Sequence, residues 1–152
     1  MGPWTYAWLI GAGAIFVLLY LRERRRSTNI RALAIRSGFN YLGRGVPRSL
    51  SLHGTPLDRA SSIWNVIDGD RRGARIIAFD CQIGTGKGSW RRTVIAVKME
   101  NDLLGAVSSN RDLTVDHSGS WAILYQPKTP SFIPAGLMPV EELEARLNAI
   151  AN

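Results

Sequence analysis

The sequence predicts an α+β protein: an N-terminal transmembrane helix, a short linker helix, an antiparallel β-meander and a C-terminal helix. Three observations predict this class. Residues 4–21 contain no charged side chain, residues 74–83 and 91–99 alternate with a period of two, and residues 139–151 carry an apolar stripe at helical spacing.

The first predicted element is a membrane-spanning helix over residues 4–21, which we group with a basic collar as an anchor, residues 1–26. Eighteen helical residues extend over roughly 27 Å, close to the roughly 30 Å of a hydrocarbon core. Arginines follow the run and no Lys or Arg precedes it, the reverse of a cleaved signal peptide. Because basic flanks stay in the cytoplasm, we expect the N-terminus outside and an α+β domain, residues 27–152, inside.

Much of the net charge of +7 lies beside this predicted anchor, since residues 22–26 contribute four Arg and one Glu. Basic side chains next to a span attract anionic lipid headgroups. The predicted headgroup contacts are Arg22, Arg24, Arg25, Arg26 and Arg31. Membrane lipids are therefore expected partners, through residues 4–21 and the collar.

Two further helices are expected in the domain. Ser27, Thr28 and Asn29 offer capping side chains for a short linker helix that ends at Gly38. Its apolar face comprises Ile30, Leu33, Ala34 and Ser37. The C-terminal helix begins at Pro139, and its buried stripe comprises Val140, Leu143, Leu147 and Ile150.

Up to seven strands are expected between these helices, joined by short turns as in an antiparallel meander. The strong candidates are residues 62–68, 74–83, 91–99 and 120–126, and the weaker ones are Ser49–His53, Gly105–Ser109 and Asp112–Asp116. This strand number resembles that of a pleckstrin-homology-like half-barrel, an analogy at the level of fold alone.

The stretch CQIGTGKGSWRR, residues 81–92, superficially resembles a phosphate-binding loop. A Walker loop needs Gly where Cys81 stands and Ser or Thr where Gly88 stands, and it is followed by a helix. We therefore predict a hairpin turn here. The stretch DGDRRG, residues 68–73, likewise predicts a tight turn, because a calcium loop does not tolerate Arg at its fifth position.

No residue is predicted to be catalytic, and no cofactor or metal is expected. Alternation puts Cys81 on the strand face of Ile77, Phe79 and Ile83, as a small core residue. His53 and His117 are too isolated to indicate a metal site. Nucleic acid is not an expected partner either, because zinc-ligand spacing, RRM-type motifs and a recognition helix are not recognisable.

A protein partner is expected, although the sequence does not identify it. Trp64 and Trp121 are expected in the core, whereas Trp90 at the hairpin is the best candidate for a contact residue. The predicted partner contacts are Trp90, Lys87 and Arg91.

The run from Gly43 to Val97 contains GTPL, an NV turn followed by glycines, and an FD hairpin with further glycines. It is similar to a family of uncharacterised bacterial proteins with a single membrane span. The resemblance implies a bacterial inner membrane location and no catalytic residues. We expect a membrane-anchored domain that binds or scaffolds without catalysis. The alternatives are a domain that senses anionic lipid and an enzyme that uses Cys81.

Overall fold

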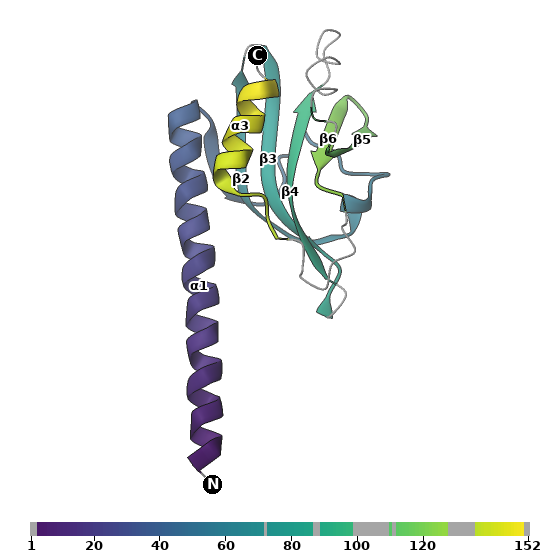
Figure 1. The fold of residues 1–152 in the computed structure, drawn as a ribbon. Helices are drawn as coiled ribbons and strands as arrows, with labels where there is room; N and C mark the ends of the chain where they lie inside the picture. Colours follow the sequence, from purple (N-terminus) through teal and green to yellow (C-terminus); the bar gives the residue numbers. More distant parts are fainter. Residues whose placement is uncertain are drawn as a thin grey trace.

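The computed structural model describes residues 3–71, 73–86, 89–98, 110, 112–127 and 136–150, without the side chains of residues 3–7. Its class is α+β, as predicted: an N-terminal helix, six antiparallel strands and a C-terminal helix (Figure 1). The elements are α1 (Pro3–Ser37), β1 (Asn40–Arg44), η1 (Pro56–Arg59), β2 (Ala60–Arg71), β3 (Ala74–Ile83), β4 (Trp90–Lys98), β5 (Thr114–Ser118), β6 (Trp121–Tyr125) and α3 (Val140–Ile150).

The strands form one sheet in the order β1-β2-β3-β4-β6-β5. The first four follow one another as a meander, but β6 rather than β5 lies beside β4, so the meander prediction is wrong for the last two strands. The burial of side chains explains this order. All five residues of β6 are buried. By contrast, β5 lies at the sheet edge, contains an Asp and a His, and has four of its five residues at least partly exposed.

The four strong strand predictions are confirmed. Three of them agree with β3, β4 and β6 to within one residue at each end, and the prediction for residues 62–68 lies inside the longer β2. The strand predicted over Asp112–Asp116 overlaps β5 but begins two residues before it. The prediction for Ser49–His53 is wrong, because this segment has no regular strand structure, buries Leu50 and leads to Thr55, which caps η1. Gly105–Ser109 lies outside the described residues.

The edge strand β1 was not predicted. Its sequence, NYLGR, has no alternation, and Gly43 adopts a φ of 78° within an irregular pairing with β2. Gly38, with a φ of 73°, ends α1 as predicted and lets the chain reverse into β1.

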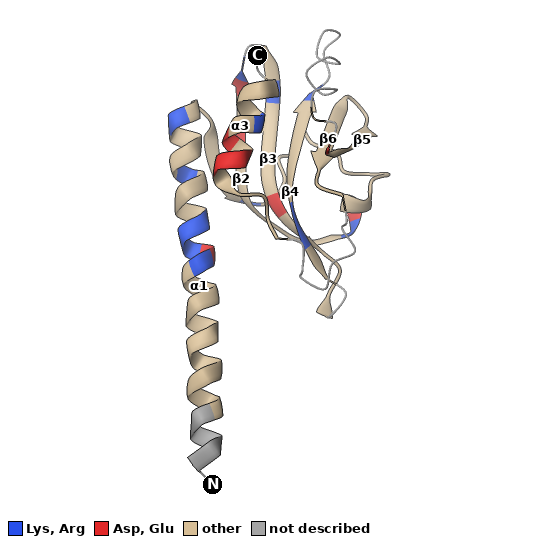
Figure 2. Cartoon of the chain, viewed as in Figure 1, with Lys and Arg blue, Asp and Glu red and all other residues tan. Residues whose placement is uncertain are grey.

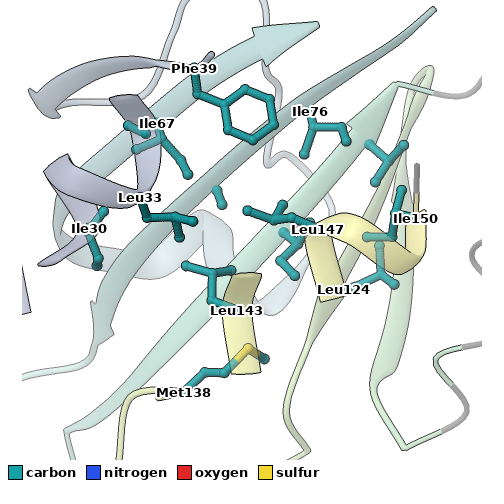
Figure 3. Close-up of a cluster of buried hydrophobic side chains, with 14 of the residues drawn as sticks. Ile30, Leu33, Phe39, Ile67, Ile76, Leu124, Met138, Leu143, Leu147 and Ile150 are labelled. Carbon is teal, nitrogen blue, oxygen red and sulfur yellow. The ribbon is translucent and has the colours of Figure 1, made fainter. Parts of the chain in front are cut away.

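Both faces of the sheet are buried. The second half of α1 and α3 cover one face, where Ile30 and Leu33 meet Leu143, Leu147 and Ile150 (Figure 3). The predicted stripe of α3 is confirmed in full. The segment before β2 packs on the other face through Leu50 and Leu57, against a cluster that includes Phe79 and Cys81.

The predicted linker helix is not a separate element. Residues 27–29 lie inside α1, which runs without a break from Pro3 to Ser37. Thr28 does not cap a helix: its Oγ1 donates a hydrogen bond to the carbonyl of Arg24, 3.0 Å away, within the same helix. The apolar face predicted for this part is confirmed, since Ile30, Leu33 and Ala34 are buried.

The first half of α1 projects away from the sheet (Figure 1). Its apolar side chains from Trp8 to Leu21 are exposed. Among the helices as the structure describes them, none is at once long enough and apolar enough to cross a membrane.

Candidate functional site at the junction of α1 and the sheet

A bulge in β2 shapes the surface that faces α1. The pairing of β2 with β3 shifts between Trp64 and Ile67, and Asn65 has a φ of 53°. In a regular strand, neighbouring side chains point to opposite faces. Here both Trp64 and Asn65 reach α1, since the Trp64 indole donates to Glu23 and Asn65 accepts from the Ser27 hydroxyl.

A buried ion pair joins α1 to β3. The Arg26 guanidinium donates from Nε and Nη2 to the two carboxylate oxygens of Asp80, both at 2.8 Å. The Arg26 and Asp80 side chains are 12% and 1% exposed. Asp80 also accepts from Asn65 at 2.9 Å and from Thr93 at 2.8 Å, so its carboxylate has four donors. A carboxylate this fully bonded has a structural role, because little of it is left to react with a substrate.

The same network reaches the segment that leads into α3. Arg26 Nη1 donates to the carbonyl of Met138 at 2.7 Å, and the Met138 amide donates to Thr93 at 3.1 Å. Asn65 accepts a further bond from the Tyr41 hydroxyl at 3.1 Å. Residues from α1, β1, β2, β3, β4 and the approach to α3 are therefore held together by one polar cluster.

A groove of about 570 Å³ lies next to this cluster. Glu23 and Ser27 of α1 form one wall, and strands β1 to β4 form the rest. The strand residues that line the groove are Tyr41, Gly43, Arg44, Ser62, Ile63, Trp64, Asn65, Gln82 and Arg91. Its volume is within the range of about 300–1,000 Å³ usual for ligand sites.

The five predicted headgroup contacts do not share one environment. Figure 2 shows basic residues along α1 directly after its uncharged half. Arg22, Arg24, Arg25 and Arg31 are exposed. Arg26 instead points into the domain and is bound by Asp80, Thr93 and Met138, so it is not available to a headgroup.

The predicted partner contacts are also divided. Arg91 lines the groove, with its guanidinium 5.5 Å from the centroid of the Trp64 ring. Trp90 packs against the cluster on the other face and is half-buried, with Arg92 4.6 Å from its ring centroid. Lys87 lies outside the described residues. The hairpin predicted here is confirmed, with Ile83 paired to Trp90. The turn predicted over residues 68–73 is too long, because Asp68–Arg71 belong to β2 and pair with β3 as far as Ala74.

Cys81 is a buried core residue, as predicted. Burial, with a smaller effect from the Asp80 charge, raises the pKa of its thiol to about 12. A thiol with so high a pKa has little thiolate at neutral pH and is a weak nucleophile. Asp80 is bonded on the opposite face of the sheet, as alternation predicted. His53 is exposed and lies 3.2 Å from Asp58, and His117 is exposed in β5.

Trp121 is buried, as predicted, whereas Trp64 is only partly buried and lines the groove. Sequence reasoning missed the roles of Asn65, Asp80, Glu23 and Arg92. Asp80 gave a signal, because a carboxylate in the middle of an apolar strand requires a buried partner.

Arg92 is fully buried on the other face of the sheet, and burial lowers the pKa of its guanidinium. It donates to the carbonyls of Arg91 and Pro127, and its Nε has no hydrogen-bond partner among the residues that the structure describes. Within the described part of the chain, no group of three or more His, Cys, Asp or Glu residues could hold a metal ion.

Comparisons with protein-family models, with curated proteins and with solved structures find no match for this chain. The family resemblance and the half-barrel analogy therefore stay predictions.

Proposed function

We propose that this protein is held at a bacterial inner membrane by α1 and that its α+β domain binds or scaffolds partners there without catalysis. The proposed orientation places the N-terminus outside and the domain in the cytoplasm, because the arginines of α1 follow its apolar half. The span expected over residues 4–21 includes four side chains outside the described part, so the support comes from Trp8 to Leu21.

The observation on which the proposal depends is exposure on every side of the helix. Residues 15–19 are Ile, Phe, Val, Leu and Leu, and each side chain is 53–73% exposed. Successive helical residues are about 100° apart, so these five cover the whole circumference. A protein partner would cover one face of a helix, whereas the hydrocarbon of a bilayer covers all of them.

The connection between anchor and domain supports a scaffolding role. Because α1 continues into the core and Arg26 is bonded to Asp80, the domain is fixed to the helix that would enter the bilayer. A domain attached in this way is positioned relative to the membrane and does not move freely on a tether.

A matched pair of substitutions tests the membrane attachment. Ile15→Asp places a charge in the apolar half of α1, where Ile15 is 60% exposed, and Ile35→Asp places it in the domain half, where Ile35 is 73% exposed. A charge at the centre of a span costs about 2.5–3.5 kcal/mol. We expect Ile15→Asp to lower partition into neutral phosphatidylcholine vesicles by about 70- to 400-fold in flotation assays.

The control, Ile35→Asp, is expected to float like the unmodified chain. Equal flotation of all three proteins, or recovery of the unmodified chain without vesicles, would contradict the proposal. The orientation is tested with reporters fused after Asn152. We expect activity from a reporter that works in the cytoplasm and none from a reporter that works only in the periplasm. Activity only of a periplasm-dependent reporter would refute the cytoplasmic placement.

A further inference from the structure

We propose that the groove between α1 and strands β1 to β4 binds the phosphate group of an anionic lipid headgroup. The groove lies at the depth where a headgroup would be found if the proposed anchoring holds, on which this inference rests. Glu23, in its wall, comes two residues after Leu21, about 3 Å further along the helix axis. The start of β4 and the apolar half of α1 lie toward the same end of the molecule (Figure 1).

Two guanidinium groups in the groove have donors to spare. Arg44 is exposed and forms no ion pair with any residue that the structure describes. Arg91 is 53% exposed and contacts Glu23 through Nη1 alone, at a long 3.4 Å. Because a guanidinium has five N–H donors in a planar fork, both side chains can donate to phosphate oxygens.

The remaining walls suit a glycerol-type headgroup. Ser62 and Gln82 are cross-strand neighbours and offer a hydroxyl and an amide. Ile63 and Tyr41 add apolar and aromatic surface. The Trp64 ring beside Arg91 restricts the position of that guanidinium, which favours binding because less motion is lost.

Glu23 determines how selective the groove is. Its carboxylate accepts from the Trp64 indole at 2.6 Å and lies near Arg91, so it opposes the entry of an anion. Replacing Glu23 with Gln should therefore increase the preference for anionic lipid. If the groove instead bound an amine, the same substitution would decrease binding, because Glu23 would be the group that attracts the cation.

The first test measures flotation of the full chain on phosphatidylcholine vesicles with and without about 20% phosphatidylglycerol. We expect Arg44→Gln and Arg91→Gln each to reduce the preference for the anionic vesicles by about fivefold and to leave flotation on neutral vesicles unchanged. The control is Arg71→Gln, which removes the same charge at the opposite end of the sheet, where Arg71 bonds to Asn148. Its effect should be below about twofold, because salt screens charges beyond about 10 Å.

Glu23→Gln is compared with Glu141→Gln, an exposed position on α3 outside the groove. We expect only Glu23→Gln to raise the preference. Equal effects of Arg44→Gln, Arg91→Gln and Arg71→Gln would overturn the proposal, because the preference would then depend on total charge and not on the groove. A loss of preference for anionic vesicles in Glu23→Gln would overturn it in favour of an amine ligand.

The second test separates this inference from the anchoring. Soluble glycerophosphoglycerol is titrated into the detergent-solubilised full chain while the arginine Nε–H signals are followed by NMR. Saturable shifts at Arg44 and Arg91, but not at Arg71, support the groove even if the chain fails to float on any vesicle, and would then identify a free phosphodiester as the ligand. Absence of those shifts together with unchanged vesicle preference in the groove variants would refute the site.

Discussion

Asp80 is the residue on which the attachment of α1 to the sheet depends most. Its carboxylate is almost completely buried and compensates the Arg26 charge. Removal of one partner from such a pair leaves an uncompensated charge in the interior, which costs about 3–5 kcal/mol. We therefore expect Asp80→Asn to lower the free energy of unfolding by roughly 3 kcal/mol, as measured by urea denaturation.

The matched control for this substitution is Asp112→Asn. Asp112 also pairs with an arginine, Arg146, but its side chain is 66% exposed. Exposed ion pairs contribute about 0–1 kcal/mol, so this variant should remain close to the unmodified protein. Similar losses in the two variants would mean that the pair of Arg26 and Asp80 is not a special element of stability.

Cys81 provides a residue-scale test of the enzyme alternative. Because burial raises its thiol pKa to about 12, iodoacetamide at pH 8 should modify the folded chain at least about 100-fold more slowly than the chain in urea. A variant with Cys81→Ala and Ala145→Cys, at an exposed site on α3, serves as the reactive reference. Native modification of Cys81 as fast as that of the reference, with loss of a measurable activity, would favour the enzyme.

The same pKa has a consequence for stability at high pH. The thiol loses its proton near pH 9 in the unfolded chain but only near pH 12 in the folded one. Between these values the folded state holds the proton more tightly, so the contribution of Cys81 to stability is complete below pH 9 and falls as the pH rises toward 12.

At the scale of elements, β2 meets Phe39, which lies between α1 and β1, at a contact that leaves no room for a side chain at Gly69. A Cβ added there would lie 2.1 Å from Cδ1 of Phe39, a buried ring between α1 and the sheet. We expect Gly69→Ala to lower the free energy of unfolding by about 1–3 kcal/mol, because the ring must move within a packed cluster.

Gly136→Ala is the control for this prediction, since a Cβ at Gly136 meets no atom of the described residues within 4 Å. Thermal denaturation of the two variants measures the difference. A Gly69→Ala variant as stable as Gly136→Ala would show that Phe39 can move aside without loss, so that the contact does not limit the packing of β2.

The elements that sequence could predict are those whose own residues determine them. The alternation of β3 and β4 and the stripe of α3 follow from local burial, and the structure confirms them. The edge strand β1 could not be predicted, because it pairs with β2 alone among the described strands and Gly43 interrupts its pattern. The order of β5 and β6 depends on which strand is the more apolar, a comparison between elements that no single segment reveals.

At the scale of the whole molecule, the candidate site was the hardest part to predict. Arg26 lies in a run of arginines that otherwise face solvent, and only its position relative to Asp80, 54 residues away in sequence, distinguishes it. The αL conformation of Asn65 is likewise not visible in the sequence, because it follows from a bulge that lets both Trp64 and Asn65 contact α1. Long-range pairing therefore determined the site, and local pattern determined most of the fold.

The unbroken course of α1 has a mechanical consequence. Its 35 residues form a rod of roughly 52 Å with no proline or left-handed residue between Trp8 and Ser37. A helix whose apolar part is mismatched to the surrounding bilayer tilts to compensate. If α1 spans a membrane as proposed, such a tilt would turn the whole domain with the helix, because α1 is bonded to the sheet through Arg26 and Asp80. The thickness of that membrane would then set the angle at which the domain meets its neighbours.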